Sequence, residues 1–269
     1  MRRFVIGDVH GCSKALRTII EQIQPTSEDL IVFLGDFIDR GPDSRGVIDL
    51  ILALSQATRV IAIRGNHELM LMGVLYGGCK PDLWLQGGGA ATLASYGGSL
   101  ERIPTSHIDF FQSLRAHHET EHELFIHAGY EPDVPVEKTT EFHRYWNHLT
   151  AVPKPHCSGK RVFVGHTPQA CGEVVDYGHI VCMDTYCFGG GWLTAMDLDT
   201  DEVIQASRHG HLRYDLASTV RKALARWFRK RFRARHSAPS TSNTLAEPAR
   251  ASLDPEWSSK MAADNGAGQ

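Results

Sequence analysis

The stretch from Ile31 to Gly41 constrains the fold more than any other part of the sequence. It reads Ile-Val-Phe-Leu-Gly-Asp-Phe-Ile-Asp-Arg-Gly, so an apolar run ends at a glycine, and two carboxylates and an arginine follow at once. A short apolar run that ends in this way is typical of a buried strand. Carboxylates delivered to the end of a buried strand cost free energy unless something cationic meets them there. The rest of the chain must therefore supply partners for these acids.

Two more units of the same kind flank this stretch. Residues 3–7 form an apolar run followed by Asp8-Val-His-Gly, and residues 59–63 form another that is followed by Gly65-Asn-His-Glu. The stretches between the runs carry apolar side chains at the spacing of one helical face. This strand-helix-strand-helix-strand order predicts parallel strands with crossover helices and an α/β fold.

The rest of the chain is less regular. Residues 84–97 are rich in glycine and contain aromatic side chains, and we predict a shaped loop with a short helix there. Residues 108–117 are predicted to form a helix. The second half holds five short apolar runs separated by turn residues, which predicts an antiparallel or mixed second sheet. These runs are residues 124–126, 161–164, 180–183, 192–196 and 203–205.

The overall composition excludes several classes of protein. The chain has 269 residues, 42% of them apolar, and a net charge of −3, so it lacks the basic field of a nucleic-acid-binding protein. Its six cysteines have no CxxC spacing, which favours free thiols over a disulfide framework. No apolar run near the N-terminus is long enough for a signal peptide, and none approaches a transmembrane helix. We expect a cytoplasmic protein, with association at the inner face of the membrane as a second option.

The C-terminal part has a different composition from the rest. We expect a catalytic domain over residues 1–210, a basic amphipathic helix over 211–236 and a disordered tail over 237–269. Residues 215–236 hold eight Lys/Arg and a single acid, with Trp and Phe at helical spacing. Such a helix is typical of docking on an anionic membrane surface or an acidic partner. Packing of its apolar face on the chain's own acidic body is the alternative.

Polar side chains follow five of the apolar runs directly, and almost all of them are hard or borderline metal ligands. In chain order they are Asp8 and His10, then Asp36, Asp39 and Arg40, then Arg64, Asn66 and His67, and finally His127 and His166. Any one of them alone would be interpreted as a cap, a turn residue or an ordinary polar side chain. Because ligands bind at the carboxyl ends of strands in α/β sheets, the whole set predicts one shared site. The absence of thiolates from the set argues against structural zinc.

The order of these residues predicts two metal ions. A pair of divalent cations about 3.5–4 Å apart needs a bridging carboxylate and flanking ligands, and Asp36 is central in the order. We expect the first cation to be held by Asp8, His10 and Asp36, and the second by Asp36, Asn66, His127 and His166.

The remaining polar residues of the set are predicted to act on the substrate. His67 is left free of metal, and Asp39 is placed to hold its imidazole in one tautomer. Arg40 and Arg64 carry the fork-shaped donors that match a phosphate. Asn66 is expected to contact the substrate as well as the second metal.

Three sequence blocks carry a resemblance to a known family. They are Gly7-Asp-Val-His-Gly, Gly35-Asp-Phe-Ile-Asp-Arg-Gly and Gly65-Asn-His-Glu. Together with His127 and His166, they resemble the metallophosphoesterase signature of the phosphoprotein phosphatase family, and especially its bacterial and bacteriophage serine/threonine phosphatases. The resemblance covers residues 3–205.

The resemblance implies a fold, a cofactor and a reaction. The fold would be a four-layer α/β/β/α sandwich of the calcineurin-like type with mixed central sheets. The cofactor would be two divalent metal ions, with manganese expected and iron or zinc as alternatives. A hydroxide bridged by both metals would attack a phosphomonoester in line, and His67, supported by Asp39, would protonate the leaving oxygen. The partner would be a phosphorylated protein or peptide.

Departures from the family pattern leave the substrate open. The phage-type enzymes carry a phosphate-binding arginine in a Trp-Asn-Arg segment, where this chain has Trp146-Asn147-His148. His148 is interpreted either as a weaker, pH-dependent phosphate ligand or as a loop histidine without a role. Hydrolases of dinucleoside polyphosphates commonly have Asn-His-Asp in the third block, whereas Glu68 stands here, which favours the protein phosphatase. Diadenosine tetraphosphate hydrolysis and a non-catalytic phosphoprotein-binding scaffold are the alternatives, and the oligomeric state stays open.

Overall fold

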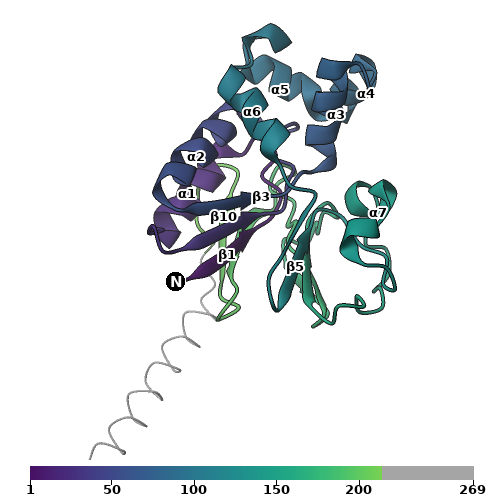
Figure 1. Ribbon diagram of the computed structural model, residues 1–269. Helices are drawn as coiled ribbons and strands as arrows, with labels where there is room; N and C mark the ends of the chain where they lie inside the picture. Colours follow the sequence, from purple (N-terminus) through teal and green to yellow (C-terminus); the bar gives the residue numbers. More distant parts are fainter. Residues whose placement is uncertain (214–269) are drawn as a thin grey trace, which may run out of the picture. The chain divides into compact units, whose positions relative to one another are not determined.

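The computed structural model describes residues 1–213, in which two five-stranded sheets are flanked by helices (Figure 1). The predicted tail, and all but the first three residues of the predicted basic helix, lie outside the described residues. Within residues 1–213, no helix is long and apolar enough to cross a bilayer.

The first sheet contains the three strands that the sequence predicts. Its order is β10-β9-β1-β2-β3, in which β1, β2 and β3 are parallel, and β9 and β10 join antiparallel at the free edge of β1. Helices α1 and α2 form the predicted crossovers. The elements are β1 (Arg3–Ile6), α1 (Ser13–Ile23), β2 (Leu30–Phe33), α2 (Ser44–Ala57), β3 (Arg59–Ala62), β9 (Trp192–Asp197) and β10 (Val203–Ser207).

The second sheet is mixed, which was one of the two predicted possibilities. Its order is β4-β5-β6-β8-β7, with β5, β6 and β8 parallel and an antiparallel strand at each edge. Two of the five predicted strands, now β9 and β10, belong to the first sheet instead. The elements are β4 (His117–Glu119), β5 (Glu123–Ile126), β6 (Arg161–Val164), β7 (Val175–Asp176) and β8 (Ile180–Cys182).

Alternation along the strands builds the layers. Val5 and Val32 of the first sheet pack against Phe125 and Phe163 of the second, so the two sheets meet face to face. The residues next to these in each strand point to the opposite face of their sheet, because successive side chains of a strand alternate between its faces. In the first sheet they join the core under α1 and α2, and in the second they lie under the segment that carries η3 (Val136–Lys138) and α7 (Glu141–Tyr145). The predicted four-layer α/β/β/α sandwich with mixed sheets is confirmed.

A helical segment connects the sheets and gathers at one end of them (Figure 1). The prediction of a helix over residues 108–117 is wrong at its C-terminal end. The helix ends at Ser113, and His117 opens β4. The reason is tertiary: the backbone N–H of Arg115 donates to the Ala62 carbonyl, and the Arg115 carbonyl accepts from Arg64, so this backbone pairs with the end of β3. The elements are α3 (Asn66–Tyr76), α4 (Pro81–Trp84), η1 (Leu85–Gly89), α5 (Ala90–Ser95), η2 (Leu100–Arg102) and α6 (Thr105–Ser113).

Candidate metal centre

The carboxyl ends of strands from both sheets meet at one buried place. The six predicted metal ligands follow β1, β2, β3, β5 and β6, and each side chain is at most 9% exposed. They are Asp8, His10, Asp36, Asn66, His127 and His166. The prediction that these strand ends converge is confirmed by their positions, whereas their role as ligands stays a prediction.

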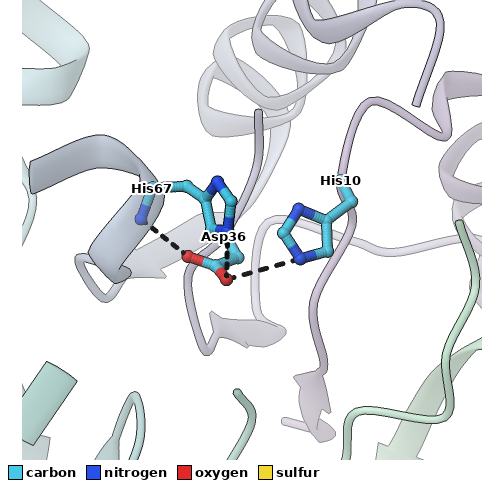
Figure 2. A group of neighbouring side chains, drawn as sticks. All are labelled: His10, Asp36 and His67. Atoms are coloured by element: carbon cyan, nitrogen blue, oxygen red, sulfur yellow. Dashed lines mark hydrogen bonds and ion pairs between the residues drawn. The ribbon is translucent and has the colours of Figure 1, made fainter. Parts of the chain in front are cut away.

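Asp36 belongs to two three-residue groups of potential ligands, in each of which the ligand atoms lie within 4.8 Å of one another. The groups are His10, Asp36 and His67, and Asp36, His127 and His166. Its Oδ2 is 3.4 Å from Nε2 of His10, and its Oδ1 is 3.4 Å from Nε2 of His127 (Figure 2 shows the His10 side). The backbone of Asp36 is left-handed, with a φ of 49°. Gly65 packs so closely that a Cβ there would come within 2.0 Å of the carboxylate. This geometry suits the bridging position predicted for Asp36.

Asn66 completes the group on the other side of Asp36. Its Oδ1 is 3.0 Å from Nε2 of His127 and 3.1 Å from Nδ1 of His166. Asp8 belongs to neither three-residue group, but it lies at the same site. One of its carboxylate oxygens accepts a hydrogen bond from the backbone N–H of His166, at 2.9 Å.

The hydrogen-bond partners of His10 and His127 indicate that this donor set fits cations. The Nδ1–H of His127 donates to the Leu34 carbonyl at 2.8 Å, and that of His10 donates to the Ile38 carbonyl at 2.9 Å. Burial lowers the pKa of both imidazoles, which favours the neutral ring with a lone pair on Nε2. That lone pair faces the carboxylate of Asp36, which is also an acceptor. A cation between these acceptors removes the conflict.

The buried carboxylates also indicate that the site fits cations. Burial, together with the neighbouring charges of Asp184 and Asp36, raises the pKa of Asp8 well above its ordinary value. Among residues 1–213, the buried Oδ1 of Asp8, Oδ2 of Asp184 and Nε2 of His166 have no hydrogen-bond partner. A Cβ on Gly165 would come within 1.9 Å of Asp8 Oδ1, so only a glycine fits beside this free oxygen. Unpaired buried oxygens and nitrogens of this kind fit divalent metal ions.

Asp184 is a site residue that the sequence analysis did not assign. Burial raises its pKa to about 7, and it lies one residue beyond Met183, which follows β8. The sequence carries the same signal here as at the other site residues. Asp184 is an acid that directly follows an apolar run.

His67 and Asp39 form the predicted pair. Nδ1 of His67 is 2.7 Å from Oδ2 of Asp39. On the other side of the ring, Nε2 is 3.9 Å from Oδ2 of Asp36, as Figure 2 shows. Burial lowers the pKa of His67, but the charges of Asp36 and Asp39 outweigh it and raise the pKa above its ordinary value. The proton on this imidazole is therefore retained more readily than on a free histidine, which suits a general acid.

The three side chains that were predicted to bind phosphate differ in their positions and partners. Arg40 is solvent-exposed, lies over the ring of Phe188 at 4.6 Å, and has Nη1 3.0 Å from Nε2 of His10. Arg64 instead donates to the Leu114 carbonyl at 3.0 Å, and within residues 1–213 no hydrogen bond or ion pair joins its side chain to the other candidates. His148 is exposed and stacks on His166, with ring centroids 4.5 Å apart. The structure thus places Arg40 and His148 at the metal centre and ties Arg64 to the end of α6.

Glu68 shapes the loop that carries Asp36. Its two carboxylate oxygens accept four backbone hydrogen bonds, at 2.8–3.3 Å, from the N–H groups of Asp36, Phe37, Ile38 and Gly65. The Glu68 side chain therefore fixes the loop after β2 to the first turn of α3. The sequence alone predicted no structural role for Glu68.

Comparison with known proteins assigns the family. The family model described as calcineurin-like phosphoesterase matches residues 1–191, so the chain belongs to the calcineurin-like phosphoesterases, which are hydrolases with a dinuclear metal site. The chain is 31% identical over 201 residues to serine/threonine-protein phosphatase 1 of Salmonella typhimurium, covering 71% of this chain and 89% of that protein.

Other relatives carry different activities. The symmetrical bis(5'-nucleosyl)-tetraphosphatase of an Acidovorax species is 29% identical over 177 residues, covering 65% of this chain and 58% of that protein. The crystal structure of a cold-active protein-tyrosine phosphatase from a psychrophilic Shewanella superposes with a TM-score of 0.56 over 79% of each chain, at 14% identity. That likeness supports the fold alone.

Proposed function

We propose that this chain is a metal-dependent serine/threonine protein phosphatase. The observation that carries the proposal is the extent of the match to the Salmonella phosphatase, which spans 89% of that protein, against 58% of the Acidovorax tetraphosphatase. Glu68 also supports it, because hydrolases of dinucleoside polyphosphates commonly have an aspartate at this position. In this chain the Glu68 side chain holds the loop of Asp36 through backbone hydrogen bonds.

The metal ligands would be the six residues that converge at the strand ends. Asp8, His10 and Asp36 would hold one divalent cation, and Asp36, Asn66, His127 and His166 the other; manganese is proposed, with iron or zinc as alternatives. When bound, the cations supply charge neutralisation for the phosphoryl oxygens and acidify water.

The other residues would act on the phosphate and the leaving group. Arg40 reaches the solvent-exposed side of the site, where its guanidinium can bind phosphoryl oxygens. His67 would donate the proton on Nε2 to the leaving oxygen, and Asp39 would stabilise the charged ring through Nδ1–H. His148, exposed and stacked on His166, would contribute a further phosphate contact.

A substrate panel tests this proposal. Release of phosphate from a phosphoserine peptide, a phosphotyrosine peptide and diadenosine tetraphosphate would be compared in the presence of manganese. We expect the highest kcat/KM on the phosphoserine peptide. Turnover of the dinucleotide alone would refute the proposal and establish the alternative activity, which the Acidovorax relative supports.

A further inference from the structure

The carboxylate of Asp39 is held by more than His67. Two side chains from the glycine-rich segment Trp84–Thr92 also donate hydrogen bonds to it. We propose that Trp84 and Thr92 are positioning residues for the reaction: they fix the Asp39 carboxylate so that it holds His67 in the orientation in which Nε2 faces the metal centre. The inference rests on the proposed role of His67 as general acid.

Trp84 approaches Asp39 from the last residue of α4. Its indole N–H donates to Oδ2 at 2.9 Å and also lies 3.2 Å from Oδ1. The side chain is 1% exposed and belongs to the main hydrophobic core, although the sequence predicted a shaped loop with a short helix rather than a core element. Gly89 lies against the indole, and a Cβ there would come within 2.3 Å of the ring. The glycines of this segment therefore let the indole reach the carboxylate.

Thr92 fixes the other carboxylate oxygen. Its hydroxyl lies 2.6 Å from Oδ1 of Asp39, and an ionised carboxylate can only accept, so the hydroxyl proton points at Asp39. The hydroxyl oxygen of Thr92 then accepts from Ser44 Oγ and from the Asp39 backbone N–H, each at 2.8 Å. Asp39, Thr92 and Ser44 are all fully buried. This network has a single consistent direction of donors.

The segment also restrains the backbone beside the acid. Asp39 and Arg40 both have left-handed backbones, with φ of 71° and 67°. Such conformations cost free energy in residues other than glycine and persist only where the surroundings hold them. The Arg40 N–H donates to the Gly88 carbonyl at 3.2 Å, and the Asp39 N–H is held by Thr92 and Ser44.

The consequence for the reaction concerns the leaving group. If Asp39 loses a donor, its carboxylate is less firmly oriented, and His67 spends less time aligned for proton donation. Substrates whose leaving oxygen needs a proton should then slow down, whereas those with a very acidic leaving group should not. A residue that only stabilises the fold would change both kinds of substrate alike.

Thr92 offers a matched pair of variants. Thr92→Val keeps the shape and removes the hydroxyl, and Thr92→Ser keeps the hydroxyl. With the full-length manganese enzyme, we expect Thr92→Val to lower kcat on phenyl phosphate by about 10- to 100-fold, the size of a lost hydrogen bond to a charged group, with KM unchanged. On 2,4-dinitrophenyl phosphate, kcat should change by less than about 3-fold, and Thr92→Ser should resemble the wild type on both substrates. Equal losses on the two substrates, or no loss on either, would overturn the proposal.

A second measurement needs no turnover. In the zinc-loaded full-length protein, the Nδ1–H of His67 should give a low-field proton resonance that is absent from His67→Gln. We expect this resonance in Thr92→Ser and a displaced or lost resonance in Thr92→Val and in Trp84→Phe, with melting temperatures showing that each variant folds. An unchanged resonance in both Thr92→Val and Trp84→Phe would refute the positioning role. Because neither test uses a phosphoprotein, failure of the proposed serine/threonine specificity would leave the result interpretable.

Discussion

At the level of single residues, the site contains two kinds of side chain. In the first kind, hydrogen-bond acceptors face one another and need a cation between them. In the second kind, each acceptor already receives hydrogen-bond donors. The Nε2 atoms of His10 and His127 both face Asp36 as acceptors. The Asp39 carboxylate, in contrast, receives donors from His67, Trp84 and Thr92. This contrast supports the proposal that the first kind of residue binds metal and that the second kind serves proton donation.

This division predicts the behaviour of Asp39→Asn. The substitution removes the charge that orients and supports His67 but leaves every proposed metal ligand in place. We expect metal content to stay at the wild-type level while kcat on phenyl phosphate falls by roughly 100-fold, which is within the range of general acid catalysis. Elemental analysis and kinetics on the same sample check this. Loss of metal from Asp39→Asn would contradict the division.

A second prediction concerns His148. Its imidazole stacks on His166 at the exposed side of the site, where an arginine would provide a permanent charge and two donors. We expect His148→Arg to lower the inhibition constant for inorganic phosphate by about 10-fold, because it adds a charge-assisted bidentate contact. His148→Ala is the control. If phosphate inhibits all three proteins equally, this position does not contact the phosphate.

The residues that the sequence could not reveal share a physical cause. Asp36, His127 and the other strand-end residues were predictable because sheet topology brings strand ends together. Trp84 and Thr92 could not be predicted, because they reach Asp39 through the turn at Gly88. The φ of 119° at this glycine leaves no trace in the apolar periodicity of the sequence. Arg64 follows a strand as the others do, yet its guanidinium bonds to Leu114.

At the scale of secondary-structure elements, the predicted strand-helix units were correct where apolar periodicity and local chemistry agreed. The parallel pairing of β1, β2 and β3 is the clearest case. The predicted helix over 108–117 ended early because the backbone at Arg115 pairs with β3, which is a contact between distant segments. The two strands that returned to the first sheet could not be assigned either, since an apolar run does not specify its neighbour.

One ion pair links two strands of the first sheet to helix α1 and predicts a pH dependence. Arg2 donates to Asp29 at 2.7 Å and to the Ile23 carbonyl at 3.0 Å, so it links the starts of β1 and β2 to the end of α1. This guanidinium holds the pKa of Asp29 well below its usual range. A lowered carboxyl pKa stabilises the fold above the unfolded-state pKa of about 4, and the stabilisation is lost as the pH falls below that value.

We therefore expect Asp29→Asn to lower the free energy of unfolding by about 2 kcal/mol at pH 7. The difference from the wild type should stay constant between pH 7 and pH 5 and shrink at pH 3. Denaturant unfolding at each pH measures it, and Glu28→Gln, at an exposed neighbouring position, is the matched control. A difference that grows as the pH falls would contradict the assignment.

At the scale of the whole molecule, two sheets packed face to face bring residues that are far apart in the chain to one site. Asp8 and His166, which are joined by a hydrogen bond, are 158 positions apart. The described residues 1–213 contain every proposed catalytic and metal-binding residue. The basic stretch 215–236 lies outside them, and its docking on an anionic membrane stays a prediction.

Removal of residues 214–269 tests that prediction. We expect the shortened chain to keep the wild-type kcat on p-nitrophenyl phosphate and to lose binding to vesicles that contain anionic lipid, because the eight basic residues of 215–236 are gone. Vesicles of neutral lipid are the control. Equal binding of the two chains to anionic vesicles would exclude a membrane role for this stretch.

The proposed mechanism depends above all on Asp36, which we propose joins two metal ions into one hydrolytic site. The most direct measurement is the metal content of manganese-loaded, dialysed Asp36→Asn beside the wild type, with activity on p-nitrophenyl phosphate measured on the same samples. We expect two ions per chain in the wild type and loss of both metal and activity in the variant. An Asp36→Asn protein that keeps two ions, or that stays active without them, would contradict the account.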